Sequence, residues 1–167
     1  MEIVLSLGSN LGDRLTNLSD TRAGIEKISG VRLISSAPIY ETEPVDVLPL
    51  HKNILFLNTV IIIDYKQQIS ELSLSLHNIE SEHGRTRSSD RNLPRRIDID
   101  IICADDLKIN QAGLIVPHPR WHERRFVVQP FADVRPNLVV PGQAKSVKEL
   151  LLTLPGRPKV LLLTDKW

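Results

Sequence analysis

The chain has 167 residues, of which 41% are apolar, and this suits one compact domain that buries roughly 70% of its unfolded surface. The formal net charge of +1 excludes a strongly basic or acidic protein, and the single cysteine, Cys103, excludes an internal disulfide. The N-terminal run MEIVLSLGSN lacks the basic head of a signal peptide, and no stretch approaches the ~18 apolar residues of a membrane span. We therefore expect a cytoplasmic protein with one domain, residues 1–167.

Apolar periodicity predicts six elements in the first 103 residues. In chain order they are a strand at 3–7, a helix at 14–29, strands at 31–40 and 54–65, a helix at 67–83 and a strand at 96–103. This β-α-β-β-α-β order predicts an α+β fold, a ferredoxin-like antiparallel sheet with the helices on one face. The sequence GSNLGD between the first two elements is predicted to be a turn whose Asn10 or Asp13 caps the helix.

The pattern beyond Ala104 is weaker. It predicts a hairpin around 112–113, a loop at 116–124, a helical piece near 126–134 and a helix at 146–152. These are the C-terminal additions to the ferredoxin-like sheet. The tail from 159 to 167 receives no assignment.

Two aspartates share one face of the strand predicted at 96–103. Asp98 and Asp100 alternate with isoleucines, so both carboxylates point to the same side, with Cα atoms roughly 6.6 Å apart. Mg²⁺ uses only one or two carboxylates and leaves its other positions to water and phosphate. The pair therefore predicts a magnesium site. The alternative is a solvent-exposed strand face on which the two aspartates form ordinary surface salt bridges.

Arginine is concentrated around this strand. Eight of the 13 arginines lie between Arg85 and Arg125, and guanidinium groups bind phosphate oxygens in a planar, bidentate fashion. The segment from Arg85 to Arg95 contains serines, Asn92 and Pro94, and we interpret it as a lid loop over a phosphate-bearing ligand. A solvated basic loop or a nucleic-acid contact is the alternative, but an aromatic content of 4% argues against base stacking on RNA.

Three other features admit both a structural and a functional interpretation. His118 stands alone in the loop VPHPR, and Glu80 is an acid near the end of a predicted helix. Residues 8–13 are glycine-containing, but nothing in the chain fits the phosphate-binding motif GxxxxGK[ST]. The residue pattern alone leaves the roles of His118 and Glu80 open.

Seven motifs together resemble the hydroxymethyldihydropterin pyrophosphokinases, folate-pathway enzymes that move a diphosphate from ATP to a pterin alcohol. They are GSNLGDR at 8–14, YETEPV at 40–45, FLN at 56–58, IESEHGR at 79–85, PRRIDIDII at 94–102, VPHPR at 116–120 and ERRFVVQPF at 123–131. The family has the same ferredoxin-like sheet that the element order predicts. The resemblance therefore covers nearly the whole chain.

The resemblance implies site residues position by position. It implies two Mg²⁺ ions held by Asp98 and Asp100, with ATP as the substrate that they bind. The implied ATP contacts are Glu80, Arg85, Arg87, Arg95, Ile101, His118 and Arg124, and the implied catalytic groups are Arg85, Arg95, Asp98 and Asp100. The implied pterin contacts are the aromatic pair Phe56 and Phe126, with Thr42, Pro44, Val45, Asn58 and Asp98 around the ring.

The chain departs from the family pattern at Asp46, Asn92, Leu93 and Pro119. Asn92 stands where the family loop often carries an aromatic, and Pro119 replaces a frequent aromatic after His118. These differences leave the closure of the loop and the substrate affinities open. None of them removes a metal ligand.

The resemblance implies in-line attack of the pterin hydroxymethyl oxygen on the β-phosphorus of ATP, with AMP as the leaving group. A metal-bound water, Asp98 and Asp100 are alternative acceptors for the hydroxyl proton. We expect a monomer that acts on small molecules, without a nucleic-acid or membrane partner. The alternatives are a non-catalytic ferredoxin-like module that binds RNA or phosphorylated ligands, and a metal-dependent phosphotransferase acting on another flat alcohol.

Overall fold

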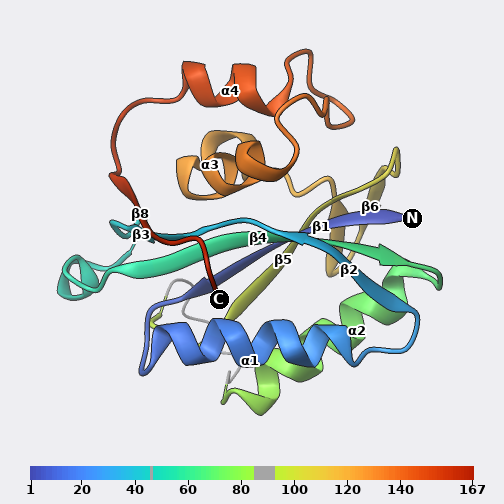
Figure 1. Ribbon diagram of the computed structural model, residues 1–167, viewed down its shortest axis with the longest axis horizontal. Coiled ribbons are helices and arrows are strands. Elements are labelled where there is room, and N and C mark those ends of the chain that lie inside the picture. Colours follow the sequence, from blue (N-terminus) through green and yellow to red (C-terminus); the bar gives the residue numbers. More distant parts are fainter. Residues whose placement is uncertain (46, 85–92) are drawn as a thin grey trace.

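The computed structural model describes residues 1–45, 47–84 and 93–167 and shows a sheet between two layers of helices (Figure 1). The strands of this sheet are β1 (Glu2–Ser9), β2 (Val31–Ser36), β3 (Ile39–Thr42), β4 (Phe56–Tyr65), β5 (Asp98–Ala104) and β8 (Val160–Thr164). The helices are α1 (Arg14–Glu26), α2 (Ile69–Glu82), α3 (Arg125–Val134) and α4 (Val147–Thr153). Single 3-10 turns lie at Pro49–His51 and Trp121–Glu123.

The strands pair in the order β5-β1-β4-β3-β8, with β2 also paired to β4, and every pairing is antiparallel. A separate hairpin joins β6 (Ile109–Gln111) to β7 (Leu114–Val116). The two central strands, β1 and β4, are buried along nearly their whole length, as their runs of valine, leucine and isoleucine predict. The sheet is therefore anchored at its centre, with β5 at one edge and β2 and β8 at the other.

Alternating residues of the central strands enter two separate cores. Leu5 and Ile61 belong to the core under α1 and α2, whereas Val4 and Ile62 belong to the core under α3 and α4, which also holds Phe131 of α3. Both faces of these strands are apolar, so both faces need a cover of helices. The two helices predicted for the first 103 residues, α1 and α2, share one face as expected, and the C-terminal helices α3 and α4 cover the second face (Figure 1).

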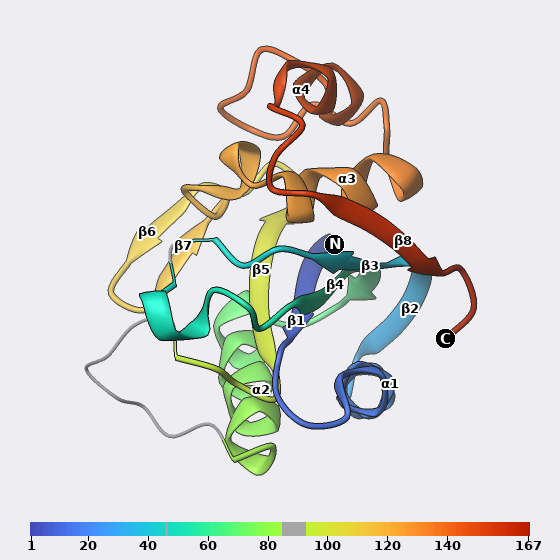
Figure 2. The same cartoon turned by 90° about the vertical axis from the view of Figure 1, so that its left-hand side faces the viewer.

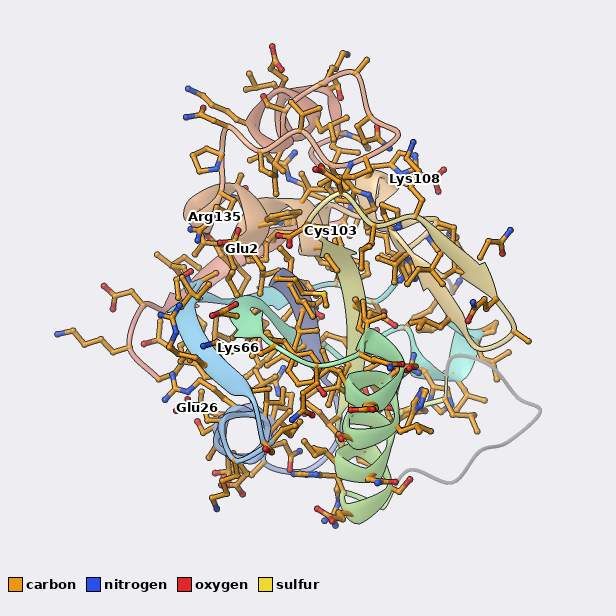
Figure 3. All side chains as sticks on the ribbon, turned by 90° about the vertical axis from the view of Figure 1, so that its right-hand side faces the viewer. Glu2, Glu26, Lys66, Cys103, Lys108 and Arg135 are labelled. Carbon is orange, nitrogen blue, oxygen red and sulfur yellow. The ribbon has the colours of Figure 1, made fainter. Side chains whose placement is uncertain are left out.

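Local contacts place the helices on the sheet. The Asp13 side chain accepts a hydrogen bond from the Thr16 backbone N–H at 3.0 Å, so Asp13 is the N-cap of α1. Ser146 and Glu149 form a reciprocal capping box at the start of α4. Beyond the end of α3, Arg135 donates two hydrogen bonds to the Glu2 carboxylate of β1, at 2.9 and 2.8 Å, and the two residues lie together in Figure 3. This pair fixes one end of α3 against the central strand.

The six elements predicted for the first 103 residues are confirmed, with two differences in the strands. The strand predicted at 31–40 is divided into β2 and β3, because Pro38 has no N–H for the ladder. At this break the Thr59 hydroxyl of β4 donates to the carbonyls of Ala37 and Pro38, both at 3.0 Å. The first strand continues through Gly8 to Ser9, so the first two residues of the predicted six-residue turn belong to β1.

The C-terminal third agrees with the weaker predictions. The hairpin and the helices predicted near 126–134 and 146–152 are present as β6-β7, α3 and α4. The unassigned tail forms β8, which pairs with β3 at the edge of the sheet (Figure 2). None of the helices in the described ranges is long and apolar enough to cross a membrane.

Candidate active site

Polar residues replace the apolar core at one end of the face covered by α3. Across the sheet, Asp98 of β5 lies opposite Gly8 of β1, and Gly8 lies opposite Asn58 of β4. Further along the same row, Asn58 lies opposite Tyr40 of β3. The strand register therefore places an acid, a glycine and an amide side by side, although they are up to 90 residues apart in the chain.

Gly8 keeps the space between Asp98 and Asn58 open. A Cβ atom at Gly8 would lie 2.9 Å from Asn58 Oδ1 and 4.0 Å from the Cβ of Asp98, and 2.9 Å is closer than side chains tolerate. The positions before Gly8 on the same face of β1 are Ser6, opposite Asp100, and Val4, which is in the core under α3. Gly8 thus lines the floor of the site with its backbone.

Asp98 and Asp100 point to the same face of β5, as their alternation predicts. Ile99 between them is buried in the core under α1 and α2, whereas the aspartate side chains retain 25% and 37% of their exposure. Each carboxylate faces an arginine: Arg95 Nη1 lies 3.2 Å from Asp98 Oδ1, and Arg124 Nη1 lies 3.8 Å from Asp100 Oδ2. The pair forms a half-exposed acidic surface flanked by guanidinium groups.

Arg95 is held in place by a contact that the sequence did not predict. Asn10 Oδ1 accepts a hydrogen bond from the Arg95 N–H at 2.8 Å, and the Asn10 N–H donates to the Arg95 carbonyl at 3.2 Å. Asn10 is buried, so the two bonds are protected from water. The sequence predicts Asn10 only as a possible helix cap, and the motif GSNLGDR was the available signal for another role.

The guanidinium of Arg95 has donor capacity left over. Its Nε is buried and has no hydrogen-bond partner among the residues that the structure describes. A buried donor without a partner is costly, and an anionic oxygen at this position would satisfy it. Arg95 is therefore suited to a phosphate beside Asp98.

His118 is fixed next to the acid pair as a neutral imidazole. The backbone N–H of His118 donates to the Ile102 carbonyl at 2.9 Å. The ring Nδ1 accepts a hydrogen bond from the backbone N–H of Arg120 at 3.1 Å. Because Nδ1 accepts, the neutral ring carries its proton on Nε2. Burial, with the nearby positive charge of Arg124, lowers the pKa of His118 to about 4. At neutral pH the ring is thus an uncharged hydrogen-bond donor.

Glu80 of α2 contacts β5 at the residue between the two acids. It is buried on α2, and its Oε1 accepts a hydrogen bond from the Ile99 N–H at 2.9 Å. Ile99 is the residue between Asp98 and Asp100, so Glu80 holds the backbone on which both carboxylates are carried. The structure gives Glu80 this supporting contact, which its spacing in the sequence did not predict.

A pocket of about 300 Å³ opens at the outer edge of β5 beside Asp100. Its wall consists of residues 99–101 of β5, part of α2, residues 113–115 of the β6-β7 hairpin, His118 and Pro119. Ile101, predicted to contact ATP, lies in this wall. The volume is at the lower end of the range for small-molecule sites, and the lining is divided about equally between polar and apolar surface.

The predicted pterin contacts gather around the end of this row: Asn58 lies in it, and Thr42 and Phe56 lie opposite each other as the next pair on the same face. Asn58 Nδ2 donates to Thr42 Oγ1 at 2.7 Å, and both side chains are buried. Phe56 has the same strand parity as Asn58, so it faces the α3 side, and Phe126 packs partly buried against the core on that side. Pro44 and Val45 follow β3 directly, and Val45 is exposed.

Some predicted residues lie outside the described ranges. These are Arg85, Arg87, Asn92 and Asp46. The role of the first two as phosphate contacts stays a prediction, as does the lid function of their loop. The structure thus brings together Asp98, Asp100, Arg95, Arg124 and His118.

The donor set fits Mg²⁺ bound together with a phosphate. Within residues 1–45, 47–84 and 93–167, no group of three or more His, Cys, Asp or Glu side chains is close enough to hold a metal. Zinc sites need such a group, whereas Mg²⁺ is commonly bound by one or two carboxylates plus substrate phosphates and water. Two half-exposed aspartates on one strand face meet this requirement.

Residues 4–136 match the family model described as 7,8-dihydro-6-hydroxymethylpterin-pyrophosphokinase. The chain is 38% identical over 130 residues to the 2-amino-4-hydroxy-6-hydroxymethyldihydropteridine pyrophosphokinase of Bacillus subtilis, covering 78% of this chain and 75% of that protein. It is 32% identical over 150 residues to the protein of the same name from Methylorubrum extorquens, covering 90% and 91%.

Longer proteins match as well. The folic acid synthesis protein of Schizosaccharomyces pombe is 33% identical over 153 residues, which are 92% of this chain and 20% of that protein. The chain thus spans about a fifth of the length of this relative. The crystal structure of wild-type Plasmodium falciparum HPPK-DHPS with pterin and p-hydroxybenzoate has the same fold, with a TM-score of 0.65 and 14% identity, covering 90% of this chain and 42% of that one.

Proposed function

Because this chain belongs to the 7,8-dihydro-6-hydroxymethylpterin-pyrophosphokinase family, we propose that it transfers diphosphate from ATP to the hydroxymethyl group of 6-hydroxymethyl-7,8-dihydropterin, releasing AMP, in folate biosynthesis. The observation that carries the proposal is the acid pair Asp98 and Asp100, set between Arg95 and Arg124 at the polar end of the sheet. No other arrangement among the described residues combines two carboxylates on one strand with such donors.

Asp98 and Asp100 are the residues that hold Mg²⁺ in this proposal. Bound Mg²⁺ would neutralise the negative charge of the phosphate groups. The aspartates orient it from one rigid strand, because Glu80 fixes the backbone between them. Two such ions are proposed.

Arg95 and Arg124 bind the phosphate chain in the same proposal. Transfer of a phosphoryl-type group needs positioning and charge stabilisation more than covalent chemistry. Arg95 meets this need with an anchored backbone and a buried Nε that has no hydrogen-bond partner within the described part of the chain. His118 adds a neutral Nε2–H donor beside Asp100, and the predicted contacts Arg85 and Arg87 would complete the set.

The pocket at the edge of β5 takes the nucleoside part of ATP. It is continuous with Asp100 and His118, so a triphosphate leaving it passes directly to the acid pair. Its lining of Ile99, Ile101 and Leu114 suits a flat base. The nucleotide would thus enter from the β5 edge of the sheet.

The pterin binds on the other side of Gly8. Phe56 and Phe126 supply two aromatic surfaces for a flat ring, and the Asn58–Thr42 pair supplies a fixed polar edge. In that position the pterin alcohol meets the phosphate chain at Asp98, which is predicted both as a metal ligand and as a pterin contact. In-line attack on the β-phosphorus of ATP then releases AMP.

A product assay tests this proposal. Protein is incubated with MgATP and 6-hydroxymethyl-7,8-dihydropterin, and nucleotides are separated, with EDTA in a parallel reaction. The proposal is supported if AMP and the pterin diphosphate form in equal amounts and if neither forms in the reaction with EDTA. Formation of ADP would indicate a different phosphotransferase, and absence of turnover together with salt-dependent RNA binding would indicate a non-catalytic module.

Two expectations stay predictions within this proposal. They are a cytoplasmic location and activity without nucleic acid. The further activities of the longer relatives are not assigned to this chain.

A further inference from the structure

Two residues of the family motifs have no role in the site described so far. They are Arg14, the last residue of GSNLGDR, and Glu41, the second residue of YETEPV. In the structure they form an ion pair, with Arg14 Nη2 2.8 Å from Glu41 Oε1. Arg14 Nη1 also donates a hydrogen bond to the Leu55 carbonyl at 3.0 Å. Glu41 lies in β3 and Leu55 directly precedes β4, so one side chain contacts both sides of the connection between these strands.

Arg14 occupies a position that its own helix does not explain. It is the first residue of α1, and the N-terminus of a helix carries a partial positive charge that disfavours a cation. The cap of this helix is made by Asp13 and the Thr16 N–H, without the Arg14 side chain. The contacts of Arg14 thus connect the helix to the strands and do not stabilise the helix itself.

The Arg14 contacts lie behind the proposed pterin site. Glu41 lies opposite Leu57, which is in the core under α1 and α2, so Glu41 is on the α1 face of the sheet. Thr42 and Phe56, the next pair, point to the opposite face by strand alternation. Arg14 is therefore separated from a pterin at Phe56 by the sheet, and it acts on the backbone that carries the pterin contacts.

The pair of Thr42 and Phe56 ends a short ladder. It is the last of three paired positions between β3 and β4, and strand ends are where local opening costs least. Arg14 bonds to the residue before each member of this pair, namely Glu41 before Thr42 and Leu55 before Phe56. The guanidinium thus holds the two strands together at their end.

The two members of this pair are not held equally. Thr42 is buried, and its hydroxyl accepts a hydrogen bond from Asn58 Nδ2 at 2.7 Å. Phe56 is only partly buried, and the Arg14 bond is made to the carbonyl immediately before it. Loss of the Arg14 side chain should therefore displace Phe56 more than Thr42.

We propose that Arg14 is a positioning residue for the pterin site, which fixes the orientation of Phe56 by joining Glu41 to the Leu55 carbonyl. Arginine suits this task because its planar guanidinium donates to two acceptors in fixed directions, whereas a lysine ammonium is a point charge on a flexible stem. The ion pair is partly exposed, so it contributes little to global stability. The inference rests on the proposed function, since it takes the pterin as the ligand.

Steady-state kinetics with each substrate varied in turn tests this role. Arg14→Ala should lower kcat/KM for the pterin alcohol about tenfold, because a misplaced contact costs binding and orientation. The KM for MgATP should stay within about twofold, since the acid pair and the pocket lie at the β5 edge of the sheet. Arg14→Lys, which keeps the charge but not the fork of donors, should recover only part of the loss. Circular dichroism verifies that each variant is folded.

A double-mutant cycle tests whether Arg14 acts through Glu41. Glu41→Gln removes the ion pair but keeps an acceptor, so its loss should be smaller than that of Arg14→Ala. The double variant should lose no more than Arg14→Ala alone, because both residues act through one contact. Arg32→Ala is the matched control: Arg32 pairs with Asp64 at the opposite end of β4, at 3.2 Å, and its removal should leave the kinetics with both substrates unchanged.

Amide NMR of the ligand-free protein tests the same contact without turnover. Arg14→Ala should shift the resonance of the Phe56 amide, because the preceding carbonyl loses a hydrogen bond. The shift should be smaller at Thr42. Arg32→Ala should leave both resonances unchanged.

The outcomes separate this inference from the proposed function. An active wild-type enzyme whose kcat/KM for the pterin is unchanged by Arg14→Ala would overturn the inference alone. So would an equal rise in the KM for MgATP, because the effect would then not be specific to the pterin site. A wild-type chain that forms no AMP from ATP and the pterin alcohol would overturn the proposed function and the inference with it.

Discussion

The two faces of the sheet differ although they are built from the same strands. On the α1 and α2 side, Leu5, Leu7 and Ile61 continue the apolar core from one end to the other. On the α3 side, the core formed by Val4, Val60 and Ile62 ends where Gly8 and Asn58 begin. Strand alternation thus lets one face provide stability while the end of the other face carries chemistry.

The largest expected effect comes from removing an acid at the polar end. Asp98→Ala should abolish diphosphate transfer, because one of the two carboxylates proposed to hold Mg²⁺ is lost. The melting temperature should change little, since the side chain is partly exposed. Initial rates are measured over a magnesium titration, with Asp106→Asn, an exposed turn residue, as control. Near-wild-type rates in saturating Mg²⁺ would exclude Asp98 as a ligand.

Arg95→Ala should lower kcat by about 10² to 10³, the usual cost of removing one donor that stabilises transition-state charge. The backbone contacts to Asn10 do not involve the side chain and should persist. The neighbouring exposed Arg96→Ala is the matched control and should change kcat little. A change in KM alone would instead assign Arg95 to ground-state binding.

A substitution in the core under α1 and α2 should affect stability and leave activity almost unchanged. Ile61→Ala should lower the free energy of unfolding by about 2–5 kcal/mol, because it leaves a cavity under α1 and α2. At a temperature where the variant is folded, kcat should remain within about twofold of wild type, since Ile61 points away from the site. Denaturant unfolding and steady-state rates separate the two effects. A large loss of kcat in fully folded protein would contradict the claim that the α1 and α2 face provides stability without taking part in the chemistry.

The smallest effect concerns the protonation of His118. Its pKa is lowered to about 4, so His118 in the ligand-free protein should titrate near pH 4 and not near 6.5 by NMR. Between these values the unfolded chain takes up a proton that the folded chain does not, so stability falls as pH decreases from 6.5 to 4. His118→Gln should weaken this pH dependence. A His118 titration midpoint near 6.5 would contradict the buried, neutral ring.

Sequence patterns predicted the parts of the molecule that depend on neighbouring residues. Alternation placed Asp98 and Asp100 on one face, and the caps and apolar stripes located α1 and α2. Resemblance to a known family then supplied the candidate site residues, and the register brings Asp98, Gly8 and Asn58 together.

Long-range contacts could not be predicted in the same way. The bonds from Asn10 to Arg95 and from Ile99 to Glu80 join distant segments, and no local pattern marks them. The tail had no assignment because its partner, β3, lies more than a hundred residues earlier. Apolar residues on both strand faces were the available signal for a second helix layer.

Paramagnetic NMR tests most directly whether the polar end of the α3 face holds the metal-bound nucleotide. Mn²⁺ replaces Mg²⁺ in the complex with ATP, without pterin, and broadens the resonances nearest to it. The account predicts that the amides of Asp98, Ile99, Asp100 and Gly8 are lost first, while those of Leu161 to Leu163 in β8 stay sharp. Selective broadening at any other part of the sheet, with these amides unchanged, would contradict it.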